Sequence, residues 1–147
     1  MNQYMKEIKV VVGDWKSCRE DAMAIRHEVF VEEQHVPPEL EMDAQDEQCV
    51  HAVAYDAQGR ALGTGRLLES AHIGRMAVRS AYRSCGVGSS ILVELMNEAR
   101  RRHYMEVVLA AQLDAQPFYA KHGFVAEGGV FMDAGIQHVT MRRALTV

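Results

Sequence analysis

The sequence predicts a mixed α/β fold, and three observations support this. Short apolar runs rich in β-branched residues, typical of strands, are interspersed with segments of helical periodicity. One strand-like run, residues 73–78, leads through a glycine-containing turn into a helical run that begins at Ser89. The chain has 147 residues, a length that suits a single domain over residues 1–147 and can bury a substantial core.

The first half of the chain is expected to fold as a strand, a helix and two more strands. Ser17 and Glu20 have the S-x-x-E spacing of a capping box, which predicts the start of the helix. Ala22, Ile25 and Val29 then share one face of that helix. The expected strands are residues 8–12, 50–55 and 61–68.

The second half predicts a long helix at residues 89–103, with its apolar residues on one face. Asp114 is in position to cap a short helix that ends at Gly123. The expected strands are residues 73–78, 106–111, 124–125 and 137–141. Periodicity by itself does not fix the order of these strands in a sheet.

Composition and charge argue against several classes of protein. The net charge of −4 gives no reason to expect nucleic-acid binding, and no apolar run is long enough to cross a membrane. Residues 1–4 are not typical of a signal peptide. The three cysteines are widely spaced and form no CxxC pair, which fits reduced thiols in a cytoplasmic protein. No metal site is expected, because Cys49 and His51 lack a second ligand pair.

The turn at residues 83–88, Arg-Ser-Cys-Gly-Val-Gly, is the most informative segment. Where a strand turns into a helix, backbone N–H groups lack partners and the helix dipole is positive, so phosphates bind well there. Gly86 and Gly88 allow the backbone to approach an oxyanion closely. A dinucleotide fingerprint would need a third glycine at Ile91, and a P-loop would need a Gly-Lys-Ser/Thr ending. A nucleotide-binding enzyme is therefore disfavoured.

Three ordered motifs together resemble the GNAT superfamily of N-acyltransferases, in its ElaA/YjcF-like branch. The R-x-x-G-x-G pattern of residues 83–88 resembles the coenzyme A pyrophosphate loop of that family. Residues 115–124, AQPFYAKHGF, resemble its A-x-x-F-Y-x-K-x-G-F signature. Residues 25–34 and the acidic residues that follow them, with His51, resemble the ElaA/YjcF-like branch.

The resemblance implies a central mixed, mostly antiparallel sheet flanked by helices, whose fourth and fifth strands splay apart around the pantetheine arm of the cofactor. It implies an N-acetyltransferase that uses acetyl-CoA as co-substrate and acetylates a primary amine. Direct transfer in a ternary complex is expected, because no residue stands out as a covalent nucleophile. The residues expected to bind acetyl-CoA are Met76, Ala77, Val78, Arg83, Ser84, Cys85, Gly86, Val87, Gly88, Ser89, Gln112, Phe118 and Lys121.

Catalysis of acyl transfer needs a proton acceptor for the amine and a proton donor for the departing sulfur. The resemblance implies that Tyr119 is the donor. Two residues are candidate bases: His72 at the start of the fourth strand, and Glu33 in the Val-Phe-Val-Glu-Glu-Gln motif. A base acting through water, or no dedicated base, is left open.

The acceptor is expected to be a cationic amine, such as a polyamine, an amino sugar or a lysine-like group. Residues 28–59 contain nine carboxylates and no lysine or arginine, so they could form an acidic wall beside the acceptor. A solvated acidic loop is the alternative. A second interpretation of the whole chain is an acyl-CoA-binding regulatory or interaction protein without turnover. A homodimer is compatible with the resemblance, since dimers are common in the family.

Overall fold

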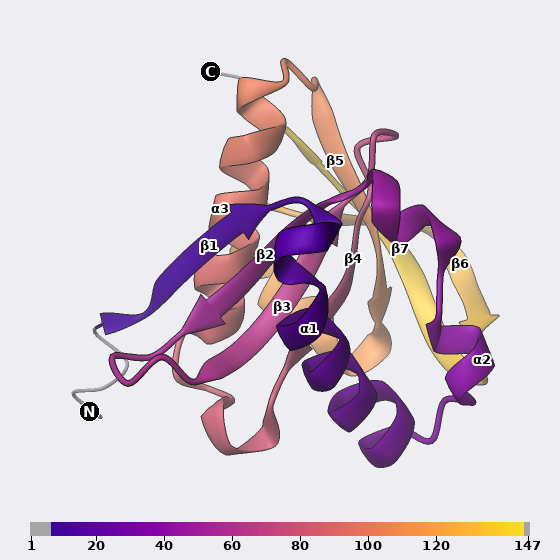
Figure 1. Cartoon of the computed structure of the whole chain (residues 1–147). Coiled ribbons are helices and arrows are strands. Elements are labelled where there is room, and N and C mark those ends of the chain that lie inside the picture. The colour runs from indigo at the N-terminus through magenta and orange to yellow at the C-terminus, as the bar shows by residue number, and fades with distance from the viewer. Residues whose placement is uncertain (1–6, 146–147) are drawn as a thin grey trace.

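A computed structural model describes residues 7–145 of the chain (Figure 1). The expectation about residues 1–4 lies outside the described part. The strands are β1 (Lys9–Gly13), β2 (Val50–Tyr55), β3 (Ala61–Leu67), β4 (Ile73–Val78), β5 (Glu106–Gln112), β6 (Val125–Asp133) and β7 (Ile136–Ala144). The α-helices are α1 (Trp15–Arg26), α2 (Pro38–Glu41), α3 (Val87–Arg101) and α4 (Gln116–Lys121). The π-helix η2 (His27–Glu33) and the 3-10 helices η3 (Ala44–Gln48), η4 (Ser80–Tyr82) and η5 (Leu113–Ala115) complete the fold.

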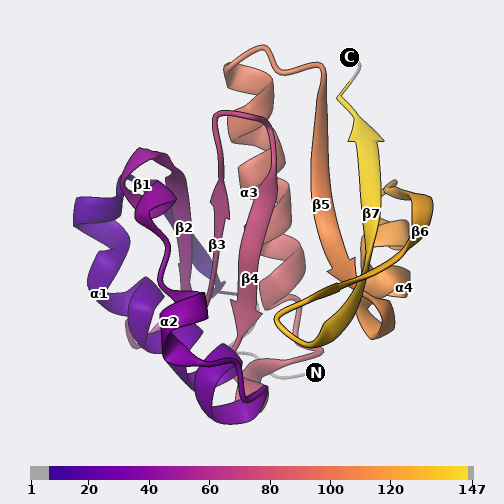
Figure 2. The same ribbon diagram turned by 90° about the vertical axis from the view of Figure 1, so that its right-hand side faces the viewer.

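The strands form two antiparallel sheets, in the orders β1-β2-β3-β4 and β5-β7-β6. β4 and β5 run parallel and side by side, but a single bridge between His72 and Val108 joins them at one end (Figure 2). Beyond that bridge the two strands diverge, so the edge of β4 that faces β5 is left without strand partners. The expected mixed α/β fold with splayed fourth and fifth strands is confirmed.

Helices cover the first sheet on both faces. The apolar face of α3 packs against β2 and β3 in the larger core, where Ile91, Leu92 and Leu95 are fully buried. α1 packs on the opposite face, and Ala22 and Ile25 are fully buried there. The apolar faces of both helices were predicted from helical periodicity, because burial of an apolar stripe stabilises such helices. Within residues 7–145, no helix combines the length and apolar character that a membrane crossing needs.

A β-bulge interrupts β4 next to the gap. Thr64 of β3 pairs with Ala77, but Arg66 pairs with Gly74, so two residues of β4 lie opposite the single residue Gly65. One of them, Arg75, has a left-handed backbone with φ of 48°. A Cβ at Gly65 would lie 2.5 Å from the sulfur of Met76, the other bulge residue, so glycine is needed there.

Several element boundaries differ from the predictions. α1 begins at Trp15 because Asp14, rather than Ser17, is its N-cap, accepting a 2.9 Å hydrogen bond from Ser17 N. α3 begins at Val87, two residues earlier than expected. Asp114 does not cap α4, because it lies within η5 and the N-cap position is Ala115. β6 has nine residues rather than the expected two.

Candidate active site

The turn from β4 to α3 has the backbone geometry of an anion site. Gly86 is the N-cap of α3 and has a left-handed φ of 88°, which favours glycine. The first helical hydrogen bond runs from Ser90 N to Gly86 O at 3.0 Å, so the N–H groups of Val87, Gly88 and Ser89 have no partner within the helix. These donors and the helix dipole favour binding of an anion such as a phosphate group.

The two glycines of this turn have different roles. Nothing lies within 4 Å of a Cβ built on Gly86, so glycine is favoured there by the left-handed backbone and not by lack of space. A Cβ on Gly88 would lie 3.3 Å from the ring of Phe118, so this glycine allows α4 to pack against α3. Ser89 reinforces that contact, because its Oγ lies 2.9 Å from Nε2 of His122. Phe118, which was expected to bind the cofactor, therefore packs its ring against the turn at Gly88.

Arg83 and Glu33, both expected in the site, bind each other at the rim of the turn. The guanidinium of Arg83 makes two hydrogen bonds to the Glu33 carboxylate, one of them 2.7 Å long, and also donates to Val78 O at 2.9 Å. Hydrogen bonds from Arg83 hold the pKa of Glu33 below its usual value. A carboxylate so stabilised is a weak base, and Glu33 does not line the cavity between β4 and β5. The structure thus disfavours the proposed base role of Glu33.

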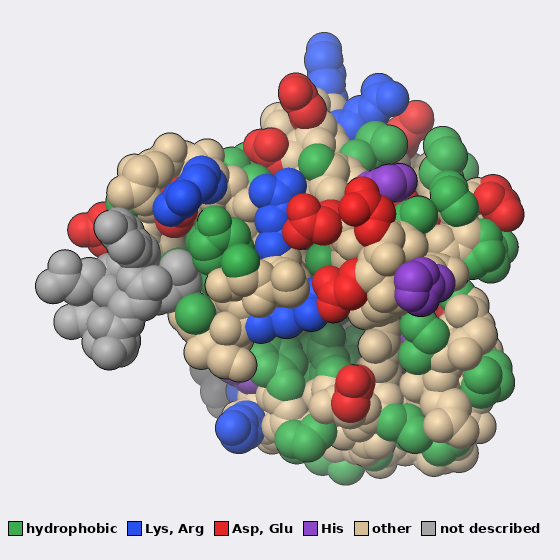
Figure 3. All heavy atoms as spheres, turned by 90° about the horizontal axis from the view of Figure 1, so that it is seen from below, with side chains coloured by type: hydrophobic (Ala, Val, Ile, Leu, Met, Phe, Trp, Pro, Cys, Tyr) green, Lys and Arg blue, Asp and Glu red, His purple; other side chains and the backbone are tan. Residues whose placement is uncertain are grey.

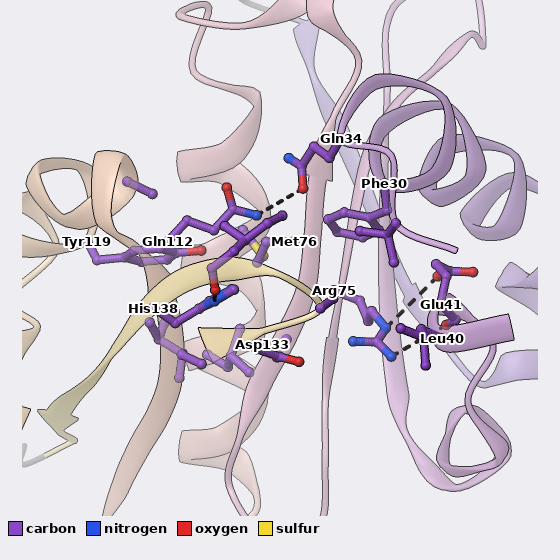
Figure 4. Close-up of a pocket in the computed structure, with 18 residues that line it drawn as sticks. Phe30, Gln34, Leu40, Glu41, Arg75, Met76, Gln112, Tyr119, Asp133 and His138 are labelled. Carbon is purple, nitrogen blue, oxygen red and sulfur yellow. Dashed lines mark hydrogen bonds and ion pairs between the residues drawn. The ribbon is translucent and has the colours of Figure 1, made fainter. Parts of the chain in front are cut away.

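A cavity of about 450 Å³ lies in the gap between β4 and β5 (Figure 4). Its walls come from η2, α2, the β4 bulge, β5, α4 and the β6–β7 hairpin. Its polar lining side chains are Gln34, Glu41, Arg75, Gln112, Tyr119, Asp133 and His138. Seen from below, a hollow with hydrophobic side chains in it lies beside a group of intermixed basic and acidic side chains (Figure 3).

Tyr119 lies where the proton donor was expected. Its side chain comes from α4 and lines the cavity, while its ring packs on Phe118 and Phe124. Burial raises the pKa of Tyr119 to about 12. The phenol therefore keeps its proton at neutral pH, as a general acid requires.

His138 also lines the cavity, and sequence reasoning missed it. It is buried on β7, and its Nδ1 lies 2.8 Å from Ile136 O. A carbonyl oxygen can only accept, so the neutral ring carries its proton on Nδ1 and leaves Nε2 as an acceptor. Its neighbours in the sequence resemble an ordinary strand, and only the pairing of β7 with β5, His138 opposite Gln112, brings it to the cavity.

His72, the other predicted base, lies away from the cavity. It is exposed at the bridge that closes the gap, and its Nδ1 lies 3.1 Å from Ser70 Oγ. His72 is not among the residues that line the cavity. The structure thus disfavours His72 as the base.

The remaining expected cofactor residues take varied positions. Met76 lines the cavity, and Ala77 and Val78 continue the open edge of β4 toward the turn. Gln112 donates a 3.0 Å hydrogen bond across the cavity to Gln34, at the end of η2, so its amide is already engaged (Figure 4). Ser84, Cys85 and Val87 belong to the turn, and Lys121 is exposed at the end of α4.

Part of the expected acidic wall is a neutralised ion cluster. Arg26 binds the carboxylates of Glu41 and Asp46, at 2.9 Å in the case of Asp46. Arg66 lies 2.8 Å from both Asp43 and Asp46. Sequence reasoning counted carboxylates in one segment, whereas Arg26 precedes that segment and Arg66 follows it. These three carboxylates are therefore not free to bind a cationic acceptor, and the cationic acceptor stays a prediction.

This ion cluster is largely buried, and its protonation follows from its contacts. Burial alone would raise the pKa of Asp46, but hydrogen bonds from Arg26 and Arg66 outweigh it and lower that pKa. His51 donates from Nε2 to Asp46 O at 2.8 Å, and burial lowers the pKa of its ring. His51 is therefore neutral. The contacts of the cluster connect α1, η3, β2 and β3.

Comparisons with known proteins agree with this geometry. A model of the acetyltransferase (GNAT) domain family matches residues 14–145. The uncharacterized N-acetyltransferase YjcF of Bacillus subtilis (strain 168) is 37% identical over 140 residues, covering 92% of this chain and 99% of YjcF. An acyl-CoA N-acyltransferase from Pseudomonas aeruginosa is 30% identical with a TM-score of 0.81, covering 94% of this chain and 100% of the other. ElaA of Escherichia coli is 25% identical with a TM-score of 0.81, covering 92% and 99%.

Proposed function

Since the chain belongs to the GNAT acetyltransferase family, an acyl-CoA-dependent N-acyltransferase family, we propose that it transfers an acetyl group from acetyl-CoA to a primary amine. The observation that carries this proposal is the cavity in the β4–β5 gap, which contains a protonated phenol and an imidazole whose Nδ1 is bound to a backbone carbonyl. Acyl transfer to an amine needs this pair of groups, one to supply a proton and one to accept it.

The open edge of β4 and the turn after it suit acetyl-CoA. An extended pantetheine arm could accept backbone hydrogen bonds from β4 as an added strand would, with the pyrophosphate at the N-terminus of α3. Arg83 would contribute to the pyrophosphate site once Glu33 is displaced from it. This arrangement places the thioester beside the bulge at Arg75 and Met76.

We assign the proton transfers to Tyr119 and His138. Nε2 of His138 accepts a proton from the amine as the new C–N bond forms. The phenol of Tyr119 donates a proton to the sulfur as the C–S bond breaks. The amine attacks the thioester directly in a ternary complex, since the cavity lining, as far as the chain is described, holds no cysteine or serine that could carry the acetyl group.

An acetylation assay with a panel of amines tests the proposal. Detection of N-acetylated product, with release of one thiol per product, would support it. His138→Ala should lower turnover about 100-fold or more, whereas the matched control His72→Ala should leave it unchanged. Tight binding of acetyl-CoA without product from any amine would favour the alternative, an acyl-CoA-binding regulatory protein.

A homodimer and a cytoplasmic location remain predictions. The second agrees with the three cysteines, which are all free thiols. Size-exclusion chromatography with light scattering would decide the oligomeric state.

A further inference from the structure

The cavity contains a guanidinium whose charge is incompletely compensated. Nη2 of Arg75 lies 3.4 Å from Glu41 O and 3.6 Å from the Asp43 carboxylate. Its Nε is buried, has no hydrogen-bond partner among the described residues and lies 3.9 Å from the Glu41 carboxylate. The nearby carboxylates are bound more closely by other arginines, Glu41 by Arg26 and Asp43 by Arg66 at 2.8 Å. Arg75 therefore has the longest contacts of the three arginines in the cluster.

The backbone of β4 holds this side chain at the cavity. Arg75 has a left-handed φ at the bulge, an unfavourable conformation for a residue with a side chain. Bulges redirect side chains and are common beside active sites. Burial, followed by the positive charges of Arg66 and Arg26, lowers the pKa of Arg75. An anion bound here would offset both unfavourable effects.

Opposite charge is available in the same cavity. The carboxylate of Asp133, on β6, is exposed and has no ion pair among residues 7–145. The cavity also has apolar lining residues, among them Phe30, Val36, Leu40 and Ile73. In Figure 4 Arg75 and Glu41 lie on one side of the cavity, Tyr119 and His138 lie on the other, and Asp133 faces the space between them.

We infer that the acceptor is a zwitterion, an amine that also carries a carboxylate and an apolar side chain, as an apolar α-amino acid does. Arg75 binds the carboxylate through charge-assisted hydrogen bonds. Asp133 attracts the ammonium group, which loses one proton to solvent to become the nucleophile, while His138 accepts the second proton as the C–N bond forms. Polyamines and amino sugars have no carboxylate for Arg75 and are poor acceptors. This inference rests on the proposed N-acetyltransferase function.

The wild-type enzyme provides the first test. Leucine, methionine and phenylalanine are compared with leucinamide, methioninamide and phenylalaninamide, which keep the amine and the side chain but lose the carboxylate. The acids should have kcat/KM values at least about tenfold higher. Equal or better use of the amides would overturn the inference while leaving the acetyltransferase function intact.

Variants identify the arginine responsible. Arg75→Gln should lower kcat/KM for leucine about 10-fold to 100-fold and leave leucinamide nearly unchanged. A purely structural role of Arg75 would lower both equally, which would contradict the inference. Arg79→Gln is the matched control, because Arg79 also has a buried Nε without a hydrogen-bond partner but lies outside the cavity lining, beside Glu28.

Binding without turnover separates this inference from the proposed function. Calorimetry of the wild-type protein with leucine or with leucinamide, in the absence of acetyl-CoA, should show tighter binding of leucine. If no amine is acetylated but leucine still binds more tightly, the proposed function fails and the Arg75 carboxylate site stands. If leucine and leucinamide bind equally, the carboxylate site is wrong.

Discussion

The two ends of the β4–β5 gap are built by different means. At the α3 end, the proposed pyrophosphate site consists of backbone N–H groups, a left-handed glycine and a helix dipole, all within residues 83–90. At the other end, the acceptor cavity consists of side chains from distant segments, including Arg75, Tyr119 and His138. A site made of local backbone depends on few side chains, whereas one made of side chains can change its substrate with a single substitution.

The largest expected effect tests the side-chain end. Tyr119→Phe removes the proton donor but keeps the buried ring, so turnover should fall about 100-fold with little change in the Kd for acetyl-CoA. Pre-steady-state kinetics with the best acceptor would measure the chemical step. Full turnover in this variant, with chemistry rate-limiting, would remove Tyr119 from the mechanism.

The next effect tests the proposed pyrophosphate site in the wild-type protein. Cys18 and Cys49 are buried, whereas Cys85 is partly exposed in the pyrophosphate turn. Acetyl-CoA, which has no free thiol, should slow alkylation of Cys85 by iodoacetamide about tenfold at tenfold its Kd. Mass spectrometry would locate the label, and Cys85→Ser should lose it. Unchanged labelling at saturating acetyl-CoA would place the pyrophosphate elsewhere.

A smaller effect concerns the rim between the two ends. Glu33→Gln removes the carboxylate that occupies Arg83, so acetyl-CoA should bind about twofold to fivefold more tightly, as expected for loss of an exposed ion pair. Turnover should stay the same. A fall in turnover of about 100-fold would instead restore Glu33 as the base. Arg83→Gln is the control, and it should weaken binding.

The smallest effect concerns His51 in the buried ion cluster, and it is measured as the pH dependence of stability. Folding lowers the pKa of His51 below its unfolded value of about 6.5. The unfolded chain therefore binds more protons below that pH, and stability should fall as pH decreases from 7. The melting temperature should drop by a few degrees, at about 2–4 °C per kcal/mol, and His51→Gln should reduce this drop. Some of it should persist, because the pKa of His122 is also lowered by burial.

The same contrast explains what the sequence could predict. The turn at Gly86 and the apolar face of α3 follow from neighbouring residues, so local patterns were sufficient. The roles of Arg75 and His138 depend on a bulge opposite Gly65 and on the pairing of β7 with β5, which no local pattern encodes. The neutralisation of three carboxylates in the expected acidic wall was missed for the same reason, since the arginines that bind them come from other elements.

The length of β6 was also missed, because a strand in which every residue is exposed has no alternation of buried and exposed positions to indicate it. Gly128 and Gly129 lie within it, and adjacent glycines are more typical of turns than of strands. As a result, Asp133 at the end of β6 was not predicted as a residue of the proposed acceptor cavity.

The π-helix η2 marks where this chain could tolerate a change of length. Its backbone hydrogen bonds join residues five apart rather than four, as in the 3.0 Å bond from Gln34 N to Val29 O. Deleting one residue within 27–33 would let the segment relax into an α-helix, because a π-helical turn accommodates about one residue more than an α-helical turn. The elements on either side would nearly keep their positions, with Arg26 in the core and Gln34 beside Gln112. Relatives that lack one residue here are expected to share the fold.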